Sequence, residues 1–120
     1  YKRQAPEDGY RVLVDKLWPR GIRKEALRYD LWAKEIAPTP GLRTWFHAAP
    51  GERWEEFRRR YTAELRSSPA VRDFVRRIAG KGTVTLLYAS KSAAGNHALI
   101  LQEYLAHATA AEEVTNARYS

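Results

Sequence analysis

Short apolar runs alternate along the chain with longer stretches whose apolar residues recur at helical spacing. Residues 10–15 have a continuous apolar centre, which predicts a strand buried on both faces. Residues 83–89 repeat that character and are the clearest strand in the sequence. Residues 28–38 fit both periods, and we interpret residues 29–32 as a short strand.

Three helices are predicted between the second and third strands. Thr39 followed by Pro40 is typical of an N-cap and a first helical residue. In residues 50–65 the apolar side chains recur every three or four positions and form one stripe. Ser68 and Pro69 open a third helix, which the glycines at 80 and 82 close.

The end of the chain is predicted to be helical and then irregular. A helix starts near Asn96, and its apolar first turns indicate that it is buried. Residues 108–120 read as a fraying helix end and a C-terminal tail. The pattern therefore predicts one α/β domain over residues 1–107, with a small parallel or mixed sheet beneath a crossover of about three helices.

Composition narrows the class of protein. The 120 residues are 44% hydrophobic and 29% charged, which suits one globular domain, and no apolar run approaches the roughly 20 residues that span a bilayer. Cysteine is absent, which excludes disulfides and thiolate sites and agrees with a cytoplasmic location. The chain also lacks methionine, so we expect a short N-terminal piece before Tyr1.

The net charge of +7 favours anionic partners, either small molecules or nucleic acid. An alternative interpretation is an ordinary soluble surface, because the arginines alternate with glutamates. The three histidines are too far apart for a local metal motif, and no cofactor is indicated.

Two loops that mix charged, aromatic and small residues, 15–21 and 88–97, follow the predicted strands at 10–15 and 83–89. If these strands are parallel neighbours, both loops open on the same edge of the sheet, where α/β proteins bind ligands. The second loop runs into a helix, whose first N–H groups favour an anion, and Lys91 adds a positive charge there. The spacing is not that of a P-loop.

Asp15 and His97 are the candidate acid/base residues, each with a structural alternative. Asp15 either transfers protons or caps the turn before Pro19. His97 is either an acid/base or a histidine packed under the sheet. Asn96 is either a helix cap or a ligand contact.

The candidate ligand-binding residues add cations and aromatic rings. Arg20 either binds an anion or pairs with a surface carboxylate. Arg43 either binds an anion or extends past Trp45 and Phe46 into solvent. Lys91 is either functional or simply solvated. Trp18 and Tyr88 could each stack on a base or sugar. The alternative for Trp18 is a place in the core.

Three segments together resemble the YeaO-like family of small bacterial proteins, a domain-of-unknown-function group. They are GYRVLVDKLWPRGIRKE, APTPGLRTWFHAAPGERWEEFRRRYTAEL and GTVTLLYASKSAAGNHALIL. The resemblance implies a cytoplasmic, single-domain α/β protein and does not indicate which reaction, if any, it catalyses. Ser92 stands where that pattern usually has Asp, which removes a carboxylate. The matching motif positions are Asp15, Trp18, Pro19, Arg20, Gly21, Arg43, Trp45, Phe46, Tyr88, Lys91 and Asn96.

Two functions follow as hypotheses. One is a site for a phosphate, nucleotide or sugar phosphate at the carboxyl edge of the sheet, in a binding protein or an enzyme. The alternative is a nucleic-acid-binding or protein-interaction module that uses the arginine-rich helices at 58–60 and 76–77.

Overall fold

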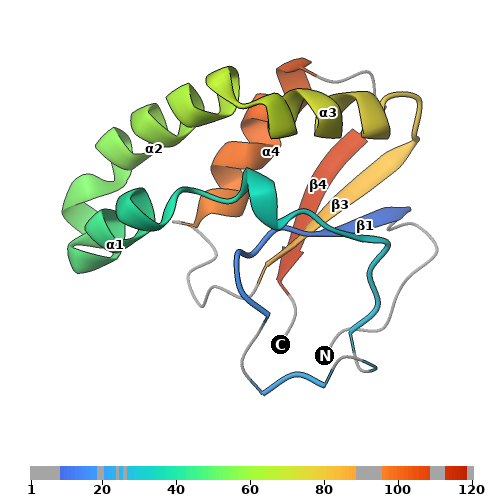
Figure 1. Cartoon of the computed structure of the whole chain (residues 1–120), viewed down its shortest axis with the longest axis horizontal. Coiled ribbons are helices and arrows are strands. Elements are labelled where there is room, and N and C mark those ends of the chain that lie inside the picture. The colour runs from blue at the N-terminus through green and yellow to red at the C-terminus, as the bar shows by residue number, and fades with distance from the viewer. Residues whose placement is uncertain are drawn as a thin grey trace.

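The computed structural model describes residues 9–18, 21–23, 25, 27–88, 96–108 and 113–118 (Figure 1). The candidate residues Arg20 and Lys91, and Ser92, lie outside the described residues. So does the segment before Gly9.

Four strands form one sheet in the described part of the chain: β1 (Tyr10–Leu13), β2 (Leu31–Trp32), β3 (Thr83–Tyr88) and β4 (Glu113–Arg118). Their order is β2-β1-β3-β4, and every neighbouring pair is parallel. The predicted α/β fold is therefore confirmed, and the sheet is parallel rather than mixed. The predicted strand near residues 29–32 is shorter than expected.

The apolar strand centres are buried on both faces because successive side chains point to opposite sides of a sheet. Val12, Val14 and Leu86 belong to the main core cluster, which includes residues of all four α-helices. Leu13 and Leu87 belong to a second cluster on the other face. This arrangement explains why residues 12–14 form an unbroken apolar run.

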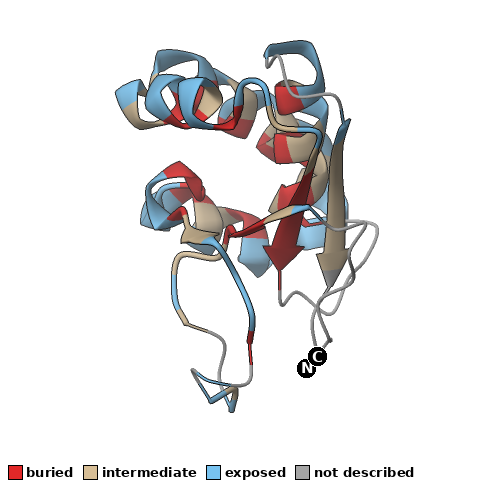
Figure 2. Ribbon diagram, turned by 90° about the vertical axis from the view of Figure 1, so that its right-hand side faces the viewer, coloured by how far each residue is buried: buried red, intermediate tan, exposed pale blue. Residues whose placement is uncertain are grey.

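The helices agree with the predicted crossover. After a 3-10 turn, η3 (Lys34–Ile36), come α1 (Pro40–Ala48), α2 (Pro50–Ser67) and α3 (Pro69–Ile78); α4 (His97–Ala108) links β3 to β4. The buried positions gather where these helices face the sheet (Figure 2). The rings of Phe46 and Phe57 stack with centroids 4.1 Å apart, which joins α1 to α2 in the core.

Crossovers leave the sheet on opposite faces. The step from β1 to β2 goes one way along the sheet, whereas the steps to β3 and β4 go the other way. Right-handed crossovers in opposite directions must lie on opposite faces. Packing agrees, because Trp18, Ile22 and Leu27 cover the face of Leu13, while the helices cover the face of Val12.

The predicted caps differ in outcome. The Ser68 hydroxyl accepts a hydrogen bond from Val71 N at 3.3 Å and caps α3 as predicted. Thr39 precedes α1, but its side chain does not cap that helix. Its hydroxyl and backbone N–H instead donate to the two carboxylate oxygens of Glu64, at 2.6 and 3.1 Å, because α2 passes close to the start of α1.

Residues 113–118 are the main correction, because they form β4 instead of part of a tail. The segment has little apolar character, so its local pattern predicts no strand. Six register pairs with β3 and a hydrogen bond from Gln102 Nε2 of α4 to Val114 O, at 3.0 Å, hold it in place. The strand therefore depends on tertiary pairing rather than on its own pattern.

Candidate functional site

The carboxyl ends of β1 and β3 form a topological switch point. The two strands are hydrogen-bonded neighbours, and the segments that follow them pass to opposite faces of the sheet. Such a divergence leaves a crevice beyond the strand ends, where open α/β sheets bind ligands. Asp15 follows β1 at this edge, and His97 begins the helix after β3.

His97 is fixed by the backbone of the first loop. Its Nε2 lies 3.0 Å from Val14 O, and because a carbonyl oxygen only accepts, this nitrogen carries the proton. The nearest Asp15 carboxylate oxygen lies 3.7 Å from Nε2, which is too long for a hydrogen bond but close enough for a charge contact. Nδ1 of the neutral ring is therefore left as an acceptor.

Several groups act on the pKa of His97. Burial lowers this pKa and is the largest influence, while Asp15 and the Val14 carbonyl raise it. The charges of Arg43 and His47 lower it further, and the net result is a pKa below the usual value for histidine. At neutral pH the imidazole is therefore uncharged. α1 packs on α2 through the rings of Phe46 and Phe57, and the Tyr61 ring of α2 lies edge-on to the His97 ring with centroids 6.2 Å apart.

Arg43 brings a cation to this edge. It is half-buried on α1, one helical turn before His47. Within the described part of the chain, its guanidinium makes no hydrogen bond or ion pair. A half-buried guanidinium without a carboxylate partner is a ready site for an anion.

Asn96 has the structural role that was one of its two interpretations. It is buried, and its Oδ1 accepts a hydrogen bond from Ala98 N at 2.9 Å, which caps α4. The cap orders the first turn of α4 and thereby holds His97 at the sheet edge.

Trp18 and Tyr88 lie on opposite faces of the sheet. Tyr88 is 4% exposed within the main core cluster. Trp18 packs on the second cluster, contacts Trp32 edge-on at 5.6 Å and donates from Nε1 to Ile22 O at 2.6 Å. The structure therefore does not bring these two rings together, and Trp18 has the packing expected of a core residue.

Sequence reasoning missed two contributors to the edge. His47 was considered only as a metal ligand, although its spacing of four from Arg43 puts both on one face of a helix. Trp32 Nε1 donates to Asp15 O at 2.8 Å and fixes the backbone that carries the carboxylate. No local pattern signals this second contact, because 17 residues separate the partners.

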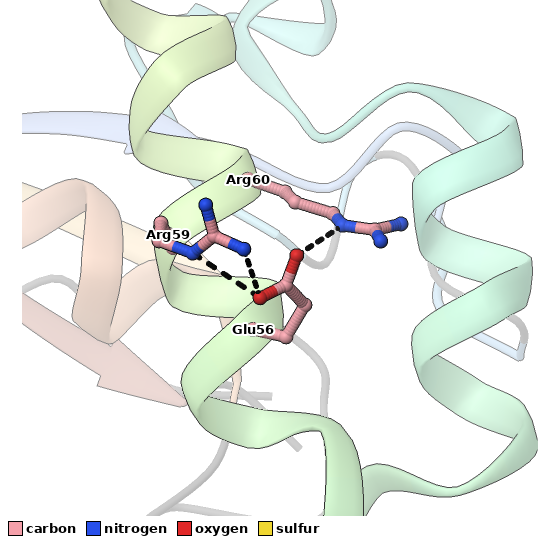
Figure 3. A network of polar contacts seen from close by, with 3 residues as sticks. All are labelled: Glu56, Arg59 and Arg60. Atoms are coloured by element: carbon pink, nitrogen blue, oxygen red, sulfur yellow. Dashed lines mark hydrogen bonds and ion pairs between the residues drawn. The ribbon is translucent and has the colours of Figure 1, made fainter.

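The arginine-rich helices carry their own counter-charges. Glu56 binds both Arg59 and Arg60, which lowers the pKa of its carboxyl (Figure 3). Arg58 pairs with Glu103 of α4, and Arg76 pairs with Asp73. This pairing is typical of a solvated surface, and binding to nucleic acid stays a prediction.

The described residues offer neither a metal site nor a membrane-spanning helix. They contain no group of three or more His, Cys, Asp or Glu side chains placed to hold a metal ion. None of their helices has both the length and the apolar character needed to cross a bilayer.

The sequence of the chain matches a protein family and several curated proteins. The protein-family model described as "Inactive DUF488-N3 subclade" matches residues 1–120. The chain is 44% identical to the uncharacterized protein YeaO of Escherichia coli over 105 residues, which are 88% of this chain and 90% of YeaO. It is 43% identical to the uncharacterized protein Rv3073c of Mycobacterium tuberculosis over 105 residues, 88% and 87% of the two chains. No solved structure matches it.

Proposed function

Because this chain belongs to the YeaO-like family of the inactive DUF488-N3 subclade, we propose that it binds a small anion and does not transform it. The site lies at the carboxyl edge between β1 and β3. Its ligand is a phosphorylated small molecule with hydroxyl groups, such as a sugar phosphate or a nucleotide.

One observation carries the proposal: Asp15 and His97, remote in sequence, approach to 3.7 Å at the carboxyl edge of the sheet, and α1, which carries Arg43, packs on α2, whose Tyr61 ring contacts the His97 ring. Arg43 supplies the fork that binds phosphate oxygens, and the positive end of the α4 dipole adds to the attraction. The Asp15 carboxylate and His97 Nδ1 are acceptors for the hydroxyl groups of a sugar. The overall charge of +7 favours the approach of such a ligand.

Among the described residues, no carboxylate orients His97 as in a catalytic dyad, so we propose binding rather than proton transfer by such a dyad. In the dyads that activate a nucleophile, the carboxylate accepts a hydrogen bond from the histidine. Here that proton goes to Val14 O, and Asp15 stays 3.7 Å away. The family's description as inactive agrees with this interpretation.

The test is a thermal-shift screen with ribose 5-phosphate, AMP and inorganic phosphate, comparing wild type with Arg43→Gln. A ligand at 100 times its dissociation constant stabilises the protein by about 2.7 kcal/mol. At about 4 °C per kcal/mol for a chain of this size, the melting temperature rises by roughly 11 °C. We expect Arg43→Gln to lose most of this shift.

Arg72→Gln is the matched control, because it removes the same charge from an exposed position on α3. It should keep the full shift. Equal responses of the two variants to every ligand would contradict a site at Arg43, since they would indicate attraction by net charge alone.

A further inference from the structure

A second candidate site lies between α1 and α2, on the other side of α1 from Arg43. A groove of about 550 Å³ runs there, and its lining includes Trp45 and Arg60. Trp45 stands two residues after Arg43, which is roughly 200° around a helix. Phe46 of the same motif is buried in the core, whereas Trp45 is only half-buried beside the groove. The groove is thus separate from the edge between β1 and β3.

Arg60 is held ready at one wall of this groove. Its Nε donates to Glu56 Oε2 at 2.7 Å, and its guanidinium carbon lies 4.5 Å from the centre of the Trp45 ring. Figure 3 shows its two terminal nitrogens pointing away from Glu56 toward α1. No described residue accepts a hydrogen bond from them. An arginine fixed on one side by a carboxylate and on its face by an indole presents a planar fork at small entropic cost.

The rest of the lining restricts what the fork can receive. Leu42, Trp45 and Ala63 provide apolar surface. Glu64 adds a negative charge, and both of its oxygens are occupied by Thr39. Arg53 also lies over the Trp45 ring, 4.8 Å from its centre, so two cations and the Glu64 carboxylate surround the groove, and their balance favours a single negative charge over the double charge of a phosphate ester. Its volume is in the range of small-molecule sites.

From these contacts we infer that the groove binds a small monocarboxylate with a flat apolar body. The carboxylate pairs with the terminal nitrogens of Arg60, and the body lies against Trp45 and Leu42. The inference concerns a site different from the one under Proposed function, so either can fail without the other.

The experiment is an NMR titration with benzoate that follows the indole N–H of Trp45, assigned with Trp45→Phe. We expect saturable shifts of this signal, and an affinity at least about tenfold weaker in Arg60→Gln, because a charge-assisted pair is lost. Arg59→Gln is the matched control. Arg59 binds the same carboxylate of Glu56 but is not part of the groove lining, so its loss should change the affinity less than about twofold.

Two further ligands separate the possible outcomes. Benzamide, which is neutral and of the same shape, should bind about tenfold more weakly than benzoate. Phenyl phosphate should also bind more weakly. The inference is overturned if benzoate leaves the Trp45 signal unmoved, if Arg59→Gln weakens binding as much as Arg60→Gln, or if either comparison ligand binds at least as tightly. The spectra of the variants without ligand show whether each is folded.

Discussion

Tyr61→Phe is a single-atom test of how α1 is held over the sheet. Tyr61 on α2 is fully buried, and its hydroxyl donates to Ile36 O at 2.6 Å. Ile36 ends the turn just before α1, so this bond joins α2 to the segment that positions Arg43. Burial, together with the charge of Glu64, raises the pKa of Tyr61, so the hydroxyl remains protonated and keeps donating.

Removing that oxygen leaves the ring in place and a buried carbonyl without its donor. The penalty for such an unsatisfied group is about 2 kcal/mol, in the middle of the usual range. At about 4 °C per kcal/mol, the melting temperature should fall by roughly 8 °C. The ring contacts with Phe57 and His97 persist, because phenylalanine keeps the same ring.

Urea unfolding followed by circular dichroism gives the free energy of unfolding directly, from the midpoint and slope. Tyr104→Phe is the control, because Tyr104 is half-buried and its hydroxyl has no hydrogen-bond partner among the described residues. It should change the free energy by no more than about 0.5 kcal/mol. If both variants lose the same stability, the bond to Ile36 does not hold this segment as argued.

Three further changes test separate parts of the structure. Since the pKa of His97 is lowered on folding, the unfolded chain takes up this proton first as the pH falls below about 6.5, and the folded protein loses stability there. In His97→Gln, unfolding curves between pH 7 and 5 should lose that part of the slope, whereas the exposed His107→Gln should keep it. Ser68→Ala should lower the free energy of unfolding by about 1 kcal/mol through loss of the α3 cap, and a loss no larger than in Ser67→Ala would refute the cap. Gly9→Ala should prevent stable folding, because Gly9 has a φ of 64° and a new Cβ would meet Thr83 O at 2.3 Å. Gly51→Ala, which meets nothing within 4 Å in α2, should instead stabilise by about 0.5–1 kcal/mol, and similar effects of the two changes would contradict the close approach at Gly9.

The sequence predicted those elements whose own residues encode their surroundings. The run around Val12 indicated a strand covered on both faces, and the stripe through Phe57 and Tyr61 indicated the buried side of α2. β4 was missed because its pairing comes from β3 and from Gln102, neither of which is visible in the local pattern.

Some features of the candidate site could likewise be predicted from the sequence, whereas others depend on tertiary packing. The switch point between β1 and β3 followed from two strands and the loops after them. The separation of Trp18 from Tyr88 depends on which face the first crossover takes. The position of Arg43 depends on how α1 packs on α2, whose Tyr61 contacts His97. Both are tertiary properties that spacing along the chain does not fix.

A crystal structure with ribose 5-phosphate would show whether the phosphate binds at the edge between β1 and β3. We expect phosphate oxygens about 2.7–3.2 Å from the Arg43 guanidinium, at the edge between β1 and β3 and beside His97. A phosphate bound elsewhere, on the arginine-rich faces of α2 and α3 with that edge left to solvent, would contradict it.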